Sequence, residues 1–195
     1  MPHLGCQVAA ITAALAMSVT TGVPVSPASA DSWEADDSQK AAVAKGYGGA
    51  VSTVDLDASA AAIEVLRKGG NAVDAAVAAA ATLGVTEPYS AGIGGGGYFV
   101  FYDADTGRVK TIDGRETAPQ AMPRDAFINP ATGTPYDFKK QATSGISVGV
   151  PGTPATWERA LDRWGSMSLG EALEPAIDVA EDGFVVDETF RLQTL

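Results

Sequence analysis

The residues best suited to chemistry stand in one short segment, Asp113-Gly114-Arg115-Glu116. A guanidinium can hold a carboxylate through two parallel hydrogen bonds, and an arginine at a strand end beside a glycine is well placed to do so. The alternative is an ordinary ion pair between Arg115 and Asp113 or Glu116. The residue types alone leave both interpretations open, so Arg115 is a candidate carboxylate-binding residue.

A glycine cluster, Gly92 to Gly97, fits the pattern G-x-G-x-x-G, and Asp113 lies at about the distance of a ribose-binding acid. A dinucleotide site requires the glycines to follow a strand and open a helix, so that the pyrophosphate meets the helix N-terminus. Here the glycines follow a predicted helix and precede a predicted strand. The pattern therefore favours a tight turn that brings backbone close to other backbone or to a ligand.

Other common chemistries are excluded by composition. The single histidine is His3 and the single cysteine is Cys6, so a Ser-His-Asp triad, a Cys-His pair and a His-ligated zinc site are all excluded. Carboxylates, lysines, arginines, hydroxyls and backbone amides remain for chemistry, and we predict no metal ligands among them. With 24 acidic against 13 basic residues and a net charge of −11, the chain is not expected to bind nucleic acid.

The first 30 residues carry no Asp, Glu, Lys or Arg and read as a targeting segment. An apolar run from Val8 to Val19 is followed by Ala28-Ser29-Ala30, which is typical of a signal-peptide cleavage site, although the start lacks the usual Lys or Arg. We expect a signal peptide over residues 1–30 that ends near Ala30, an acidic flexible leader over 31–43, and a secreted or periplasmic protein. No later apolar run is long enough for membrane insertion after cleavage.

The elements that must position Arg115 can be predicted from residue spacing. Aromatic residues 98–102 and the alternating residues 108–112 predict two strands of a hairpin, joined by the turn residues 103–107. A strand is also expected over 50–54, and a helix over 58–68 with Asp57 or Ser59 as its N-cap. A helix is expected from its N-cap Asn71 to Gly84, almost wholly Ala and Val and therefore buried. Another is expected from its N-cap Thr153 to Trp164, and a last one from Ser168, in a capping box with Glu171, to Gly183 with a restart at Pro175.

Several motifs in order closely resemble the start of the γ-glutamyltransferase family. The resemblance covers about residues 44–195 and is carried by Gly69-Gly-Asn-Ala-Val-Asp-Ala-Ala-Val-Ala79, Gly84-Val-Thr-Glu-Pro88, Gly92-Ile-Gly-Gly-Gly-Gly-Tyr-Phe99, Asp113-Gly-Arg-Glu-Thr-Ala-Pro119 and Val150-Pro-Gly-Thr153.

This resemblance implies an α+β fold, the four-layer αββα sandwich of N-terminal nucleophile hydrolases, made as an inactive precursor that cuts itself into a large and a small subunit. It implies a threonine nucleophile, glutathione and other γ-glutamyl compounds as substrates, and water, amino acids or dipeptides as acceptors. Arg115 would hold the substrate's α-carboxylate. No cofactor is implied.

The sequence also departs from the family pattern, because it contains no Thr-Thr-His-like nucleophile motif. We therefore expect residues 44–195 to be only the N-terminal portion of a large subunit, with the nucleophile downstream, no catalytic residue in this chain and no activity by itself. Two alternatives stay open: a cephalosporin or glutaryl β-lactam acylase of the same superfamily, and a non-catalytic carboxylate-binding secreted protein.

Overall fold

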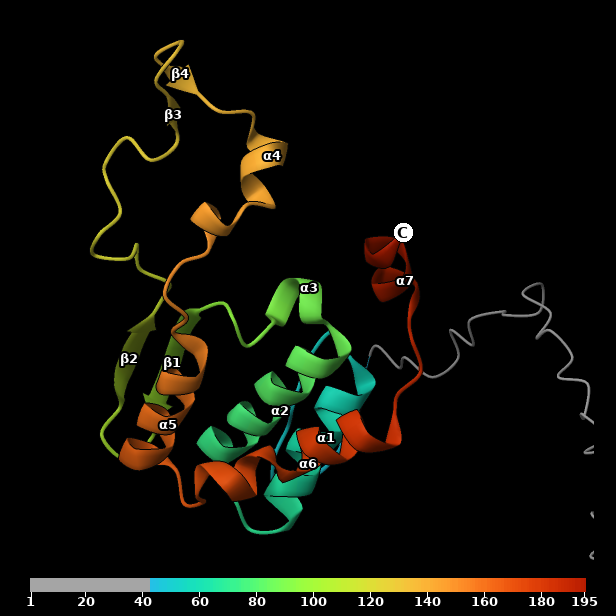
Figure 1. Cartoon of the computed structure of the whole chain (residues 1–195). Coiled ribbons are helices and arrows are strands. Elements are labelled where there is room, and N and C mark those ends of the chain that lie inside the picture. Colours follow the sequence, from blue (N-terminus) through green and yellow to red (C-terminus); the bar gives the residue numbers. More distant parts are fainter. Residues whose placement is uncertain (1–42) are drawn as a thin grey trace, which may run out of the picture. The chain divides into compact units, whose positions relative to one another are not determined.

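The computed structural model describes residues 43–195. The predicted signal peptide, residues 1–30, and residues 31–42 of the predicted leader lie outside the described residues. From residue 43 onward the chain combines helices with antiparallel strands, as the sequence predicts (Figure 1).

Three helices pack against one another and contain most of the buried alanines and valines: α1 (Leu56–Arg67), α2 (Ala72–Thr86) and α6 (Leu169–Asp182) (Figure 1). Helix α2 contacts both of the others. Its Val77 and Ala78 are fully buried, and most of its other side chains are buried too, whereas Ala76 is exposed and Ala80 and Leu83 are only partly buried. The predicted burial of this Ala/Val helix is therefore confirmed for the faces that contact α1 and α6, where small side chains let the helices approach closely, but not for the face with Ala76, Ala80 and Leu83, which lines a pocket.

The second layer is a hairpin with a helix packed on one face. Strands β1 (Gly97–Asp103) and β2 (Arg108–Gly114) pair antiparallel, and α5 (Thr153–Trp164) packs against them. The rings of Phe99 and Phe101 lie 6.2 and 5.0 Å from that of Trp164, centroid to centroid. Alternate residues of a strand point to opposite faces, so these inward rings join the hairpin to the helical core.

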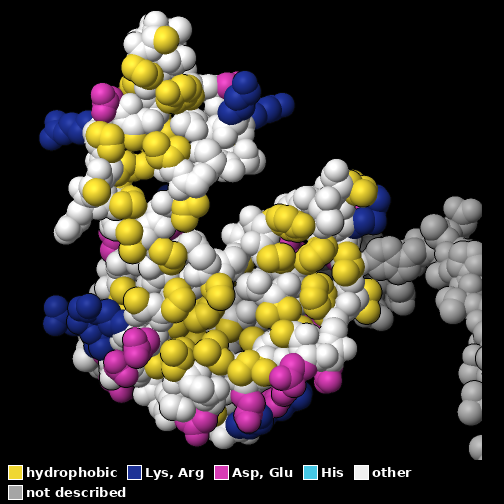
Figure 2. All heavy atoms as spheres, in the orientation of Figure 1, with side chains coloured by type: hydrophobic (Ala, Val, Ile, Leu, Met, Phe, Trp, Pro, Cys, Tyr) yellow, Lys and Arg dark blue, Asp and Glu magenta, His cyan; other side chains and the backbone are white. Residues whose placement is uncertain are grey.

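The opposite face of the hairpin is apolar and uncovered among the described residues. Tyr98, Val100 and Tyr102 are 60–66% exposed there, and Val109 on the neighbouring strand is similarly exposed. In Figure 2, hydrophobic side chains spread across the middle of the visible face, and acidic side chains gather along its lower edge.

The remaining elements are short. They are α3 (Pro88–Ala91), β3 (Ile128–Asn129), β4 (Thr134–Pro135), α4 (Phe138–Ala142), a 3-10 helix (Gly145–Ser147) and α7 (Glu188–Thr194). Residues 119–152, which the sequence predicts as a loose Pro- and Gly-rich stretch, thus contain only two-residue strands and single helical turns.

A buried carboxylate ties the start of α2 to the turn between α5 and α6. Asp74 is fully buried and accepts hydrogen bonds from the backbone N–H groups of Asn71, Ser166 and Met167 and from the Ser166 hydroxyl. Burial alone would raise the pKa of Asp74, but these hydrogen bonds outweigh it and lower the pKa below 3.8. Asn71 in turn caps α2, as predicted, and Asp74 completes its capping box.

Two predicted helix boundaries are wrong. Helix α1 begins at Leu56, and its N-cap is Asp55 rather than Asp57 or Ser59, because the Asp55 carboxylate accepts a hydrogen bond from the Ala58 N–H at 2.8 Å. Helix α2 continues through Gly84 to Thr86. Gly84 does not end the helix but allows close packing, since a Cβ at this position would lie only 3.3 Å from the Ile93 side chain.

Three further local predictions also need correction. Residues 50–54 form no strand, because no other described strand pairs with them. Helix α5 starts at Thr153, but its N-cap is Gly152 and no side chain caps it. Pro175 does not restart a helix: α6 is continuous through it, with the ring buried, after a Ser168–Glu171 capping box as predicted.

Candidate functional site

Three of the motifs found in the sequence meet in the structure. The carbonyl of Gly95 accepts hydrogen bonds from the N–H groups of Gly152 and Thr153 at 3.0 and 3.2 Å. The Val150 N–H donates to the Thr117 carbonyl at 2.9 Å. The glycine turn, the segment after β2 and the start of α5 are therefore joined through their backbones.

Close backbone packing explains why glycine is needed at this junction. A Cβ on Gly114 would overlap the Thr156 hydroxyl, and a Cβ on Gly152 would overlap the carbonyl of Gly114. A Cβ on Gly96 would lie 2.8 Å from the backbone nitrogen of Glu116. Any side chain at these positions would force the three segments apart, so the glycines hold the end of β2 in a defined place.

The glycine cluster does not have the setting of a nucleotide-binding loop. It follows α3 and leads into β1, so no helix begins at its end. Its role among the described residues is the close packing just described, which agrees with the tight-turn interpretation of the sequence.

Arg115 lies directly after the last residue of β2. Its backbone N–H donates to the Asp113 carboxylate at 3.1 Å, which fixes the chain direction at this point. Its side chain is 62% exposed, so the guanidinium extends from a rigid backbone toward solvent.

Glu116 lies beside the Arg115 guanidinium. Its Oε2 lies 3.4 Å from Arg115 Nε, and this buried oxygen has no hydrogen-bond partner among residues 43–195. The carboxylate fits beside Gly95 and Gly149; a Cβ on Gly149 would lie 2.7 Å from the Glu116 Cβ. The two sequence interpretations of Arg115 are therefore compatible, because Oε2 accepts no hydrogen bond from the guanidinium, whose donors can still bind a carboxylate ligand.

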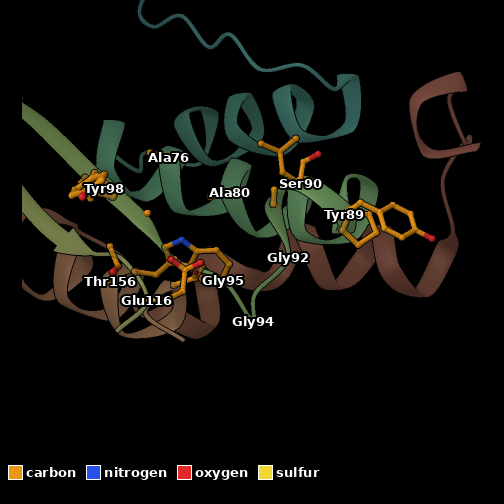
Figure 3. Close-up of a pocket in the computed structure, with 18 of the residues that line it drawn as sticks. Ala76, Ala80, Tyr89, Ser90, Gly92, Gly94, Gly95, Tyr98, Glu116 and Thr156 are labelled. Atoms are coloured by element: carbon orange, nitrogen blue, oxygen red, sulfur yellow. The ribbon is translucent and has the colours of Figure 1, made fainter. Parts of the chain in front are cut away.

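A pocket of about 860 Å³ opens on the Glu116 side of this junction (Figure 3). In Figure 3, Glu116 and Thr156 lie next to Gly95, and Tyr89 stands at the far end of the pocket. The walls come from α2, α3, the glycine turn, the start of β1 and α5.

A smaller pocket of about 460 Å³ opens on the Arg115 side. Its walls are the end of β2, residues 150–152 and one side of α5, and its charged lining residues are Asp113, Arg115, Arg159 and Arg163. Sequence reasoning missed Arg159 and Arg163. Their spacing of four residues on the predicted helix was the available signal, since it places both on one side of α5.

Metal sites and membrane spans were sought in the same range. Within residues 43–195, no group of three or more His, Cys, Asp or Glu side chains is arranged to hold a metal ion. No helix in the described part of the chain is both long and apolar enough to cross a membrane.

Comparison with known proteins gives a consistent result. The sequence profile of the gamma-glutamyltranspeptidase family matches residues 58–194. The "Glutathione hydrolase proenzyme" of Bacillus subtilis (strain 168) is 45% identical over 142 residues, which is 73% of this chain and 24% of the relative. The "Acylase ACY 1 proenzyme" of Pseudomonas sp. (strain V22) is 42% identical over 147 residues, or 73% of this chain and 26% of the relative.

A solved structure agrees with the sequence matches. The gamma-glutamyltranspeptidase from Pseudomonas nitroreducens, solved in complex with L-DON, superposes with a TM-score of 0.71 at 38% identity, covering 77% of this chain and 44% of that chain. The predicted α+β fold of an N-terminal nucleophile hydrolase is confirmed by this match. The chain spans about a quarter of the length of the curated relatives it matches.

Proposed function

The chain belongs to the gamma-glutamyltranspeptidase family, and from this premise we propose that it works as part of a secreted γ-glutamyltransferase or glutathione hydrolase. In this proposal the complete enzyme cleaves γ-glutamyl amide bonds and transfers the γ-glutamyl group to water, amino acids or dipeptides. This chain spans about a quarter of the curated relatives, so in this proposal the rest of the enzyme comes from further sequence.

Arg115 is the observation that carries the proposal. The Arg115 side chain is exposed, its backbone N–H is bonded to Asp113, and the nearby Glu116 Oε2, 3.4 Å from Nε, accepts no hydrogen bond from it. In this proposal the guanidinium holds the α-carboxylate of a γ-glutamyl group through two parallel hydrogen bonds. A carboxylate held there places the γ-carbonyl at a fixed distance from the reacting groups.

The reacting groups belong to the proposed remainder of the precursor. A threonine freed at the N-terminus of the small subunit would attack the γ-carbonyl, its own α-amine would take the hydroxyl proton, and backbone N–H groups would stabilise the oxyanion. The C–N bond breaks, the protonated amine leaves, and water or an acceptor amine then cleaves the acyl ester. This chain contributes binding and orientation, and by itself is expected to be inactive.

Secretion is part of the proposal. The apolar run Val8 to Val19 and the Ala28-Ser29-Ala30 site support export, and N-terminal sequencing of the exported protein should find Asp31 first. Retention of residues 1–30 in the exported protein would contradict it.

The test of function uses the complete gene product and a γ-glutamyl anilide as substrate. Arg115→Ala should raise KM by about 10- to 100-fold, because hydrogen bonds between charged groups contribute about 1.5–3 kcal/mol. Arg115→Lys should fall between wild type and alanine, since it keeps the charge without the paired geometry.

Arg108→Ala is the matched control, since Arg108 is an exposed arginine at the other end of β2 and lines neither pocket. If both alanine variants have the same KM, the role of Arg115 is wrong. If the wild-type gene product releases no anilide, the proposed function itself is wrong.

A β-lactam side-chain acylase is the second candidate, supported by the similarity to the acylase of Pseudomonas sp.. A glutaryl group also ends in a carboxylate that Arg115 can hold. Comparing kcat/KM for glutaryl-cephalosporin and glutathione separates the two, because only glutathione carries the α-amine.

A further inference from the structure

The smaller pocket is unusually rich in positive charge for this protein. Three arginines line it, Arg115 after β2 and Arg159 and Arg163 on α5, whereas Asp113 is its only acidic lining residue. The whole chain carries a net charge of −11. A local excess of cations in an acidic protein favours anions at this point and disfavours them elsewhere on the surface.

No ion pair among the described residues involves Arg159 or Arg163. Both residues are exposed. Four other cations of the described residues are paired with carboxylates, namely Lys68, Lys110, Arg115 and Arg191. The two α5 guanidiniums are therefore available to a ligand.

The spacing of the arginines suggests the size of that ligand. Thr156 packs directly against Gly114, the residue before Arg115. At 1.5 Å per helical residue, Arg159 and Arg163 begin about 4.5 and 10.5 Å further along the α5 axis than Thr156. An extended tripeptide is about 10 Å long. The rise along α5 from Thr156, which contacts Gly114, to Arg163 is therefore close to the length of a tripeptide-sized molecule with a carboxylate at each end.

Resting on the proposed function, we infer that Arg159 and Arg163 form a subsite for a second carboxylate of the γ-glutamyl substrate. Arg115 holds the α-carboxylate, and the α5 pair attracts a carboxylate at the other end of a short γ-glutamyl peptide. The substrate class is thus γ-glutamyl peptides with a free C-terminal carboxylate, in preference to γ-glutamyl compounds with a neutral leaving group.

The test compares two substrates that differ only in this carboxylate: glutathione and its glycyl ethyl ester. The complete gene product is assayed as wild type and as the double variant Arg159→Gln/Arg163→Gln. The matched control is Lys139→Gln/Lys140→Gln, which removes two exposed cations from α4, outside both pockets.

An exposed ion pair changes an equilibrium by up to about fivefold, so losing two should lower kcat/KM for glutathione by about tenfold, through KM. The ester should change less than about twofold, and 0.5 M NaCl should reduce the difference between the substrates. Arg159→Lys/Arg163→Lys should restore most of the preference.

Several results would overturn the inference. The first is an equal loss of kcat/KM on glutathione and its ester in the double glutamine variant, and the second is no loss on either substrate. The third is a selective loss of the same size in the α4 control. A wild-type product that cleaves neither glutathione nor its ester overturns the proposed function and this inference with it, whereas cleavage without selectivity overturns the subsite alone.

Discussion

Replacing Asp74 by asparagine should destabilise this protein more than any conservative change at its surface. The carboxylate is fully buried, and its Oδ2 accepts from the Asn71 N–H at 2.7 Å and from the Ser166 hydroxyl at 2.6 Å. Its Oδ1 accepts from the N–H groups of Ser166 and Met167 at 2.9 and 3.1 Å. One side chain thus satisfies donors from two segments that are far apart in the sequence.

The expected magnitude follows from which bonds asparagine can keep. Its Oδ1 still accepts from Ser166 and Met167, but each bond loses its charge, at a cost of about 1 kcal/mol. Its amide places hydrogens where Oδ2 was, and although the Ser166 hydroxyl can rotate to accept one, the Asn71 N–H cannot. An unpaired buried N–H costs about 1–3 kcal/mol. The sum is about 3–5 kcal/mol, a large part of the 5–15 kcal/mol typical of a domain.

Urea unfolding followed by tryptophan fluorescence measures this directly, since Trp157 and Trp164 lie in the same core. Asp162→Asn is the matched control, because Asp162 is an exposed aspartate on α5. We expect a lower unfolding midpoint for Asp74→Asn at pH 7 and an unchanged midpoint for the control.

The same variant should change the pH dependence of stability. Hydrogen bonding lowers the pKa of Asp74 in the folded state below 3.8, more than burial raises it. A lowered folded pKa stabilises the protein above the unfolded value, about 3.9, and this stabilisation is lost as pH falls toward the folded pKa. The gap between wild type and Asp74→Asn should therefore narrow below about pH 4. A loss under about 1 kcal/mol at pH 7, or a gap independent of pH, would refute the reasoning.

Two further predictions concern the hairpin. Gly114→Ala should lower the free energy of unfolding by about 1–3 kcal/mol, because its Cβ overlaps the Thr156 hydroxyl. Adding Thr156→Ala should recover part of this loss, and purely additive effects of the two substitutions would argue against the contact. Lys110 Nζ lies 2.9 Å from the Asp103 carboxylate and holds its pKa at about 2. Lys110→Gln should therefore raise the pKa of Asp103 toward 3.8 in an NMR titration, and an unchanged pKa would contradict the pairing. The Asp103 contribution to stability is present above pH 3.8 and is lost as pH falls toward 2.

Local signals in the sequence predicted most of the regular elements. The alternation of residues 98–102 and 108–112 predicted the hairpin, and Ser168 with Glu171 predicted the start of α6. Both depend on contacts within a few residues, so they can be read without tertiary information. The expected strand at residues 50–54 was wrong for the opposite reason, because a strand exists only where a partner strand lies beside it.

For the site, the sequence predicted Arg115 but left its two interpretations open, and the geometry made them compatible. Whether Glu116 engages Nε or the terminal nitrogens depends on where Gly95 and Gly149 place the Glu116 carboxylate. That placement depends on backbone segments that lie 21 and 33 residues from Glu116 in the sequence.

By itself, the sequence determined the family, the excluded chemistries and the arginine most suited to a carboxylate, because residue types and short spacings carry that information. The tertiary structure decided that the glycine turn, the end of β2 and the start of α5 form one junction, and that Arg159 and Arg163 share a pocket with Arg115. These are contacts between distant segments, and only the packing of the hairpin against α5 brings them together.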